Sequence, residues 1–398
     1  MTRSPDATGA ESPAYTNPDA DPAWMRATLA PLVAASYWFD PGDRGKPFTV
    51  RIRFSGHRLG VDGKPGAADR FEIVETVRDV LPGSGPVAVT ARVAGINEGE
   101  WTVTAEPLLE RSHRGSKAGG HVRPADTQKD LPANPSFFRA LRWWGTPGMS
   151  ASVPGTVRST IRAFASVPGS ITGSWPVLVG LGAIVGLMMQ SYLIRRGHVD
   201  GAAALRLSLA ASLAGLIGSK VWFIAASRKL SAATLREGLC IQGFVAGAAL
   251  VLIGGLLLFH LPIGSFLDAS AVGLFFGMAI GRPGCFLTGC CAGHPTASRW
   301  GLWASDQRIG LRRVPIQLWE ALLALVIGLV ALALVTQPIV NVPGAIALGG
   351  LAIYTLGRQV LFPFRAEPRR SSLGRPSSLA VAALVLAADA TCWAITCL

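Results

Sequence analysis

Residues 265–296 read SFLDASAVGLFFGMAIGRPGCFLTGCCAGHPT, and the rest of the chain is best interpreted from here. The first part is an apolar run of the kind found in membrane helices. The second part gathers glycines, cysteines, an arginine and a histidine. A charge near bilayer depth is energetically unfavourable, so Arg282 is expected to face a polar cavity or a partner. The stretch therefore predicts a membrane helix that ends in a functional site.

Apolar runs of similar length fill the second half of the chain. Together with the first part of the quoted stretch they make seven, at about 175–194, 205–227, 240–260, 265–281, 315–337, 343–362 and 377–397. Most of them reach the roughly 20 residues that a helix needs to cross a ~30 Å hydrocarbon core. We therefore expect residues 171–398 to form an all-α polytopic membrane domain of about seven transmembrane helices.

The first half of the chain has a different pattern. Residues 1–35 are polar and rich in Asp, Pro and Ser, which is typical of a disordered tail and not of a signal peptide. Within 36–110, short segments alternate apolar and polar residues between turn residues, so we expect a small β-rich, β-sandwich-like soluble domain. Residues 111–170 follow as a basic linker, in which FFRALRWW (137–144) is typical of an interfacial segment.

The composition also bounds the function. Half of the residues are hydrophobic, 15% are charged, and the formal net charge is +13. Such basicity indicates either nucleic-acid binding or basic loops beside a membrane. The arginines lie mostly in short loops between apolar runs, and the sequence has no run of lysines and no aromatic–basic platform. The membrane interpretation is therefore favoured, and we expect no nucleic-acid partner.

A second arginine, Arg358, lies within the sixth apolar run. Two guanidinium groups in a dry cavity form a natural phosphate clamp, because each presents a planar fork of donors. Asp268 and Glu320 are the acids expected to orient them. The alternative is that these charges only pair with one another and hold helices together.

The six cysteines lie in or beside apolar segments, and buried thiols are the simplest interpretation. Cys285, Cys290, Cys291 and His294 give the spacing C-x4-C-C-x2-H. Four roles stay open for them: a soft-metal site, a redox pair, a thiolate beside Arg282 that accepts an acyl or glyceryl group, or small packing residues. The spacing is not a standard zinc pattern, so we expect no metal and no cofactor.

The order of these motifs resembles the prolipoprotein diacylglyceryl transferases, a family of seven-helix bacterial membrane enzymes. The family signature Gly-Arg-x-Gly-Asn-Phe is GRPGCF (281–286) in this chain, and Asp268 matches a family aspartate at the same offset. Three further segments are similar to family elements, namely GSKVWF (218–223), PIQLWE (315–320) and RQVLFPFR (358–365). The resemblance covers about residues 170–398 and no part of 1–165.

The resemblance implies an activity and a location. The family moves the diacylglyceryl group of phosphatidylglycerol to the lipobox cysteine of a prolipoprotein, and glycerol phosphate leaves. A multi-pass, transferase-like protein of the bacterial plasma membrane is therefore expected, with phosphatidylglycerol or a related anionic phospholipid and a prolipoprotein as partners. The residues expected to bind substrate are Arg282, Gly281, Gly284, Cys285, Gly293, Asp268, Gln317 and Glu320.

Several positions depart from the family pattern. The family histidine proposed as the base is replaced by Gln242 in GLCIQGFVAG (238–247), the signature asparagine is Cys285, and a family glutamate is Cys290. The expected catalytic residues of this divergent member are Arg282, Arg358, Gln242 and Cys290. Two alternatives stay open: a non-catalytic phospholipid-binding scaffold, and a thiol-redox membrane protein that uses Cys285, Cys290 and Cys291.

The orientation in the membrane is left open by two opposing arguments. Thirteen Lys and Arg residues between Arg158 and Arg375 would lie on the N-terminal side of the membrane, and only Arg195, Arg196 and Arg206 on the other. The positive-inside rule then places the N-terminus in the cytoplasm. Members of the resembled family instead have the N-terminus outside and the active face toward the outer leaflet.

Overall fold

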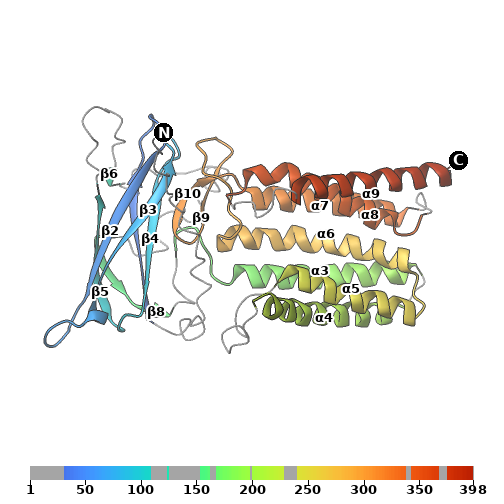
Figure 1. Cartoon of the computed structure of the whole chain (residues 1–398), viewed down its shortest axis with the longest axis horizontal. Helices are drawn as coiled ribbons and strands as arrows, with labels where there is room; N and C mark the ends of the chain where they lie inside the picture. The colour runs from blue at the N-terminus through green and yellow to red at the C-terminus, as the bar shows by residue number, and fades with distance from the viewer. Residues whose placement is uncertain are drawn as a thin grey trace, which may run out of the picture.

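The computed structural model describes residues 31–108, 123–124, 153–161, 167–197, 200–227, 240–337, 342–366 and 374–397. Along the long axis of the molecule, a two-sheet β-sandwich lies next to a bundle of helices (Figure 1). Residues 1–30 of the expected tail and the expected interfacial segment 137–144 lie outside the described residues.

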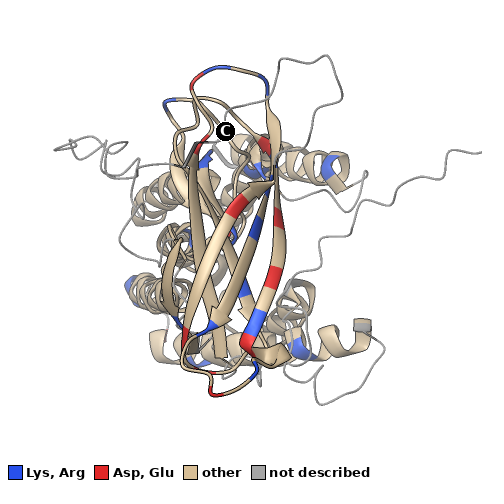
Figure 2. Cartoon of the chain, turned by 90° about the vertical axis from the view of Figure 1, so that its left-hand side faces the viewer, with Lys and Arg blue, Asp and Glu red and all other residues tan. Residues whose placement is uncertain are grey.

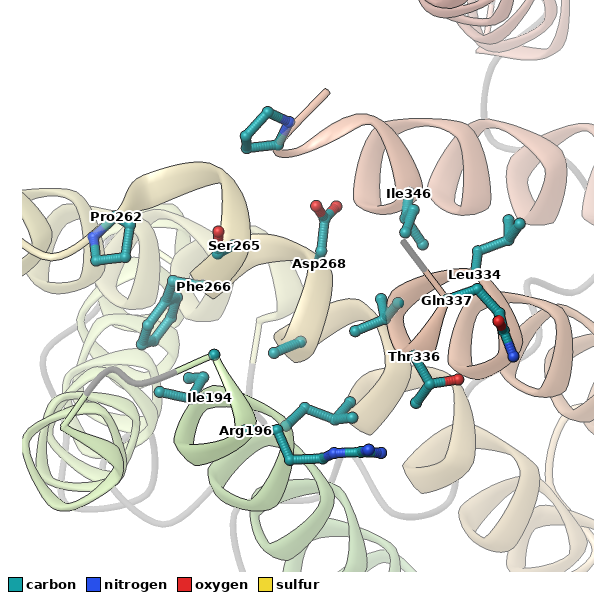
Figure 3. A pocket seen from close by; sticks show the side chains of 15 residues that line it. Ile194, Arg196, Pro262, Ser265, Phe266, Asp268, Leu334, Thr336, Gln337 and Ile346 are labelled. Atoms are coloured by element: carbon teal, nitrogen blue, oxygen red, sulfur yellow. The ribbon is translucent and has the colours of Figure 1, made fainter. Parts of the chain in front are cut away.

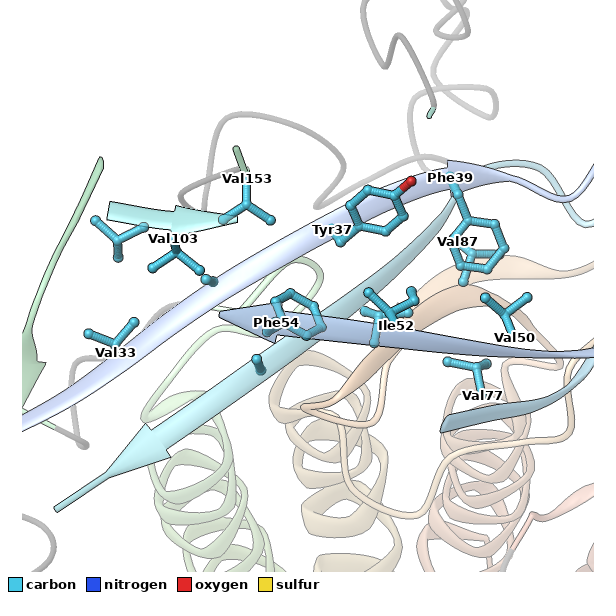
Figure 4. Close-up of a cluster of buried hydrophobic side chains, with 14 of the residues drawn as sticks. Val33, Tyr37, Phe39, Val50, Ile52, Phe54, Val77, Val87, Val103 and Val153 are labelled. Atoms are coloured by element: carbon cyan, nitrogen blue, oxygen red, sulfur yellow. The ribbon is translucent and has the colours of Figure 1, made fainter. Parts of the chain in front are cut away.

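Among the described residues, ten strands build the sandwich. They are β1 (Pro31–Asp40), β2 (Phe48–Arg58), β3 (Arg70–Val80), β4 (Val87–Ala94), β5 (Glu100–Leu108), β6 (Arg123–Pro124), β7 (Gly155–Arg158), β8 (Thr160–Ile161), β9 (Leu302–Ser305) and β10 (Ile309–Arg313). One sheet has the order β6-β1-β4-β10-β9 with β8 beside β1, and the other has the order β3-β2-β5-β7. The apolar side chains that alternate along the strands meet between the sheets, where Phe39, Ile52 and Phe54 are fully buried (Figure 4).

The outer face of the second sheet is charged with both signs. Arg53 on β2 forms ion pairs with Glu72 on β3 at 3.3 Å and with Glu106 on β5 at 3.2 Å. Figure 2 shows acidic and basic residues interspersed along the strands of the sandwich. Such a surface is typical of a sheet with one face on the core and one face in water.

The sandwich extends beyond the bounds expected from the sequence, 36–110. Strand β1 begins at Pro31, inside the expected tail, and β6, β7 and β8 come from the expected linker. The apolar segment 30–39 shows no alternation because nearly every side chain of β1 is buried, on both faces of the strand. Strands β9 and β10 come from the connection between two membrane helices, so the chain does not divide cleanly at residue 171.

The hairpin of β9 and β10 joins the two parts of the molecule. Ile309 and Gly310 of β10 pair with Val89 and Ala88 of β4. Trp303 of β9 is fully buried, its ring stacks on Trp38 with centroids 5.4 Å apart, and its indole Nε1 donates to a sandwich carbonyl, Pro86 O, at 2.9 Å. A hairpin from the connection between two helices of the bundle therefore completes one sheet of the sandwich.

We expect Trp303→Ala to destabilise the sandwich by about 3–5 kcal/mol, because a buried aromatic ring and its hydrogen bond are lost together. Thermal unfolding of the full chain in detergent measures the effect. Trp300→Ala is the matched control, since Trp300 belongs to the same connection but is 68% exposed. Equal unfolding midpoints for the two variants would show that the hairpin does not hold the sandwich.

The bundle is formed by α3 (Ser174–Arg196), α4 (Gly201–Ser227), α5 (Ile241–Leu258), α6 (Ile263–Thr288), α7 (Ile316–Thr336), α8 (Ala345–Leu361) and α9 (Gly374–Cys397). Among the described residues, six of these helices are long and apolar enough to cross a membrane, and α5 is shorter. The expected polytopic membrane domain is thus confirmed, while the expected count of seven spans is not.

Helix α6 lies at the centre of the bundle, against α3, α7 and α8. Its closest approach is to α3, where Gly182 and Gly186 face Gly273 and Gly277. A Cβ atom on Gly182 would lie 2.5 Å from the carbonyl oxygen of Gly277, so glycine is needed for the two backbones to touch. This contact places the C-terminal end of α6 beside the sandwich (Figure 1).

Candidate functional site

Three arginines surround one buried glutamate where α6, α7 and α8 meet the sandwich. Glu320 on α7 has a side chain that is only 2% exposed. Its Oε2 lies 3.1 Å from Arg282 Nη1, and its Oε1 lies 3.4 Å from Arg365 Nη1 and 3.7 Å from Arg358 Nε. The formal charge of this arginine–glutamate cluster is therefore +2.

The three arginines differ in their access to solvent or lipid. The side chain of Arg365 is 5% exposed, that of Arg282 is 17% exposed, and that of Arg358 is 41% exposed. Arg365 is therefore mainly a buried partner of Glu320, whereas Arg358 and part of Arg282 are open to a ligand. Arg282 also donates from Nη2 to the hydroxyl of Tyr354 at 3.4 Å.

Tyr354 is a site residue that the sequence reasoning missed. It is buried on α8, one helical turn before Arg358. That spacing of four residues was the available signal, because it places both side chains on one face of the helix.

The cluster lies close to the ends of its helices. Arg282 is about 9 Å from the end of α6 and Glu320 about 6 Å from the start of α7, at a rise of 1.5 Å per residue. Exposed aromatic side chains, Trp175, Trp319 and Phe364, mark the same ends of α3, α7 and the short helix η4 (Phe362–Phe364). Aromatic belts of this kind lie at the membrane–water interface, which favours a position near the lipid headgroups for the cluster.

The segment that follows α6 is tied to both neighbouring elements. Gly293 forms a β-bridge with Arg365, and Pro295 forms one with Arg313 of β10. Arg313 donates to the carbonyl oxygen of Gly293 at 3.3 Å and pairs with Asp306 at 2.7 Å. The hairpin and the arginine–glutamate cluster are thus connected through residues 293–296.

The three glycines predicted to bind substrate, Gly281, Gly284 and Gly293, lie against neighbouring segments in the structure. Gly281 and Gly284 face α3, where a Cβ atom on Gly284 would lie 3.1 Å from Trp175 Cα. A Cβ atom on Gly293 would collide with the carbonyl oxygen of Val314. Gly284 and Gly293 therefore need glycine because backbones approach each other closely there, whereas a Cβ atom on Gly281 would make ordinary van der Waals contact with Val179.

The cysteines at the end of α6 form a cluster of thiols. Cys285 is buried one turn after Arg282, and the thiol of Cys290 donates to the carbonyl oxygen of Cys285 at 3.7 Å. Gln317 on α7 donates from Nε2 to the carbonyl oxygen of Cys290 at 2.8 Å. Within the described part of the chain, no group of three or more His, Cys, Asp or Glu side chains is arranged to hold a metal ion.

Asp268, expected beside Arg282, lies at the other end of α6, about 21 Å away along the helix. Its carboxylate accepts hydrogen bonds from the backbone N–H groups of Gly344 at 2.7 Å and Ala347 at 2.8 Å, which begin α8. It also lines a cavity of about 390 Å³ at that end, where its side chain is directed toward the start of α8 (Figure 3). Asp268 therefore caps a helix and does not orient the arginines.

Gln242 is also placed apart from the cluster. It is exposed at the start of α5, and its Oε1 accepts a hydrogen bond from the thiol of Cys240 at 2.7 Å. Helix α5 packs against α4, on the opposite side of the bundle from α8 and α9 (Figure 1). Its expected catalytic role stays a prediction, without a contact to support it.

We expect Asp268→Ala to lower the free energy of unfolding by about 1–2 kcal/mol, as the loss of a helix cap does, and to leave the affinity for an anionic phospholipid unchanged. Asp268→Asn should retain most of the stability, because its amide oxygen can still accept a hydrogen bond. Thermal unfolding and phosphatidylglycerol binding, measured on the same detergent preparation, check both statements. Loss of lipid binding in the Asn variant would show that Asp268 does take part in binding the phospholipid.

Fold and site together define a multi-pass membrane protein with a cationic cluster near the ends of its helices. Comparison with known protein families identifies the kind of membrane protein. The sequence pattern of the prolipoprotein diacylglyceryl transferases matches residues 165–394, more than half of the 398-residue chain. The chain belongs to this family, whose members are transferases of lipoprotein biosynthesis.

Individual relatives are similar at modest identity. A phosphatidylglycerol–prolipoprotein diacylglyceryl transferase of Dehalococcoides mccartyi is 30% identical over 172 residues, which are 39% of this chain and 65% of the relative. A protein of the same name from a second strain of that species is 29% identical over 137 residues, 32% of this chain and 51% of its own length. One from Nostoc sp. is 25% identical over 209 residues, 48% of this chain and 74% of its own.

Proposed function

We propose that this protein transfers the diacylglyceryl group of phosphatidylglycerol, or of a related anionic phospholipid, to a thiol. The observation that carries the proposal is the arginine–glutamate cluster, which holds three guanidinium groups around one carboxylate at headgroup depth. Its excess positive charge suits a phosphodiester, which carries one negative charge. Family membership and the names of the relatives support the same reaction.

The accessible arginines supply the electrostatic part of the reaction. Arg358 and Arg282 bind the headgroup phosphate, while Arg365 keeps Glu320 in place between them. The sulfur of an acceptor thiolate attacks the glyceryl carbon, the bond from that carbon to the phosphate oxygen breaks, and glycerol phosphate leaves with the electron pair. Guanidinium groups aimed at that oxygen stabilise the charge that develops on it in the transition state.

The acceptor must lose a proton before it attacks, because the thiolate is the nucleophile and a free cysteine has a pKa near 8.5. The positive field of the cluster favours the thiolate when the thiol is brought beside it. The proton passes to water, while the hydroxyl oxygen of Tyr354 holds Arg282 through the hydrogen bond that it accepts. We take the lipobox cysteine of a prolipoprotein as the acceptor, from the names of the relatives.

A transfer assay tests the proposal. Membranes that contain the full chain are supplied with phosphatidylglycerol labelled in its acyl chains and with a peptide that carries a lipobox cysteine. We expect label to move to the peptide, and not to a peptide with serine in place of that cysteine. Phosphatidylethanolamine serves as the control donor. No transfer by intact, inserted protein would reject this reaction and favour the non-catalytic lipid-binding scaffold.

The thiol cluster favours one other candidate, a thiol-redox membrane protein. Three cysteines gather at the end of α6, where the thiol of Cys290 lies 3.7 Å from the carbonyl oxygen of Cys285, and neighbouring thiols of this kind are candidates for a disulfide. Replacing Cys285, Cys290 and Cys291 with serine separates the two candidates. A transferase should retain activity in at least the Cys291→Ser variant, whereas a redox protein should lose its function when any of the paired thiols is removed.

A further inference from the structure

The turn between β9 and β10 contains a glutamine in a strained backbone conformation. Gln307 has φ +74°, in the left-handed region that glycine, asparagine and aspartate tolerate and that other side chains seldom adopt. Its Nε2 donates to the carbonyl oxygen of Thr288 at 3.1 Å, and its Oε1 accepts from Arg92 Nη1 at 3.3 Å. One side chain thus joins strand β4 of the sandwich to the last residue of α6.

Thr288 is the point at which α6, α3 and the sandwich meet. Its carbonyl oxygen also accepts from Ser170 Oγ at 3.0 Å, and its own hydroxyl oxygen accepts from the backbone N–H of Trp175 at 3.1 Å. Arg282 lies six residues earlier on the same helix, and Cys290 follows two residues later. A shift of Thr288 therefore moves the arginine and the thiols together.

The turn presents Gln307 in a fixed position. The backbone N–H of Gln307 donates to Ser305 Oγ at 3.0 Å, and Asp306 accepts from the backbone N–H groups of Arg308 at 3.1 Å and Ile309 at 2.7 Å. The carboxylate of Asp306 also pairs with Arg313. A turn that is tied at each residue cannot release the strain locally, so glycine would be the more stable choice at position 307 unless its side chain were needed.

We propose that Gln307 is a positioning residue for the candidate site. Its two hydrogen bonds fix the end of α6 relative to the N-terminal sandwich. The sandwich is then a required part of the site and not an appended domain. This inference rests on the proposed function for one of its measurements, the transfer rate. It rests on the structure alone for the other, the reactivity of the thiols.

Two variants and one matched control test the inference in the full chain. Gln307→Gly removes both contacts and the backbone strain, while Gln307→Glu retains the acceptor for Arg92 and loses the donor to Thr288. Asp79→Gly is the control, because Asp79 is another non-glycine residue at positive φ, 55°, and is exposed near the end of strand β3. The measurements are kcat and KM for phosphatidylglycerol, the unfolding midpoint, and the rate of maleimide labelling of Cys290 and Cys291 read by peptide mass spectrometry.

We expect both Gln307 variants to lower kcat roughly five- to tenfold, the factor that corresponds to one lost hydrogen bond, with KM nearly unchanged. Maleimide labelling of the two thiols should be several times faster. The unfolding midpoint of Gln307→Gly should equal or exceed that of the wild type, which a merely structural residue would not show. Asp79→Gly should match the wild type in transfer and labelling.

Other results overturn the inference. Wild-type kcat and labelling in Gln307→Gly would show that the contact positions nothing, and an equal loss in Asp79→Gly would show a general effect of the sandwich. If the wild-type protein transfers no lipid, the proposed function fails by itself. Labelling then decides alone: faster labelling in both Gln307 variants supports the positioning role, and unchanged labelling rejects it.

Discussion

Replacing Arg282 with alanine should lower the rate of diacylglyceryl transfer by about 10²–10³-fold, the loss that follows removal of one preorganised donor from a transition state. The residue touches both Glu320 and Tyr354 and retains an accessible fraction, so it links the buried part of the cluster to the ligand. The labelled-lipid transfer assay measures the rate in membranes that contain equal amounts of inserted protein.

Two further variants make this expectation specific. Arg282→Lys retains the charge but not the planar fork, so we expect it to recover only part of the rate. Arg195→Ala removes an exposed arginine at the other end of the bundle, where Arg195 donates to Ser191 Oγ, and should transfer like the wild type. A wild-type transfer rate in Arg282→Ala would show that the arginine–glutamate cluster takes no part in the reaction.

Replacing Glu320 with glutamine should destabilise the membrane domain by about 3–5 kcal/mol, because breaking a buried ion pair leaves uncompensated charge. Here the effect is concentrated, since one carboxylate that is 2% exposed faces three guanidinium groups. Thermal unfolding in detergent, followed at constant lipid content, gives the change in midpoint.

A double variant tests the assigned cause. If repulsion among the arginines destabilises Glu320→Gln, then removing the most buried arginine as well, in Glu320→Gln with Arg365→Gln, should restore part of the midpoint. Glu106→Gln is the surface control, since Glu106 is 64% exposed in its pair with Arg53 and such pairs contribute about 0–1 kcal/mol. Equal midpoints for Glu320→Gln and Glu106→Gln would contradict the role of Glu320.

The sequence predicted the pairing of Arg282, Arg358 and Glu320 for a physical reason. Charges within apolar segments must find partners, because hydrocarbon does not solvate them, and few such charges were available. The same reasoning placed Asp268 with them and was misleading. A buried carboxylate is satisfied equally well by the free N–H groups at the start of a helix, and sequence spacing does not show which of the two it meets.

Local patterns were therefore sufficient for the elements themselves: the membrane helices follow from apolar length, and strands such as β2 follow from alternation. Tertiary structure alone decided that β10 pairs with β4, although more than 200 residues separate Ile309 from Val89. It also decided that Gln307 reaches Thr288 and that Tyr354 meets Arg282. Strands of four and five residues, such as β9 and β10, are too short for their sequence pattern to indicate which strand they pair with. Their pairing becomes favourable only when Trp303 and Leu311 are buried in a core that distant segments build.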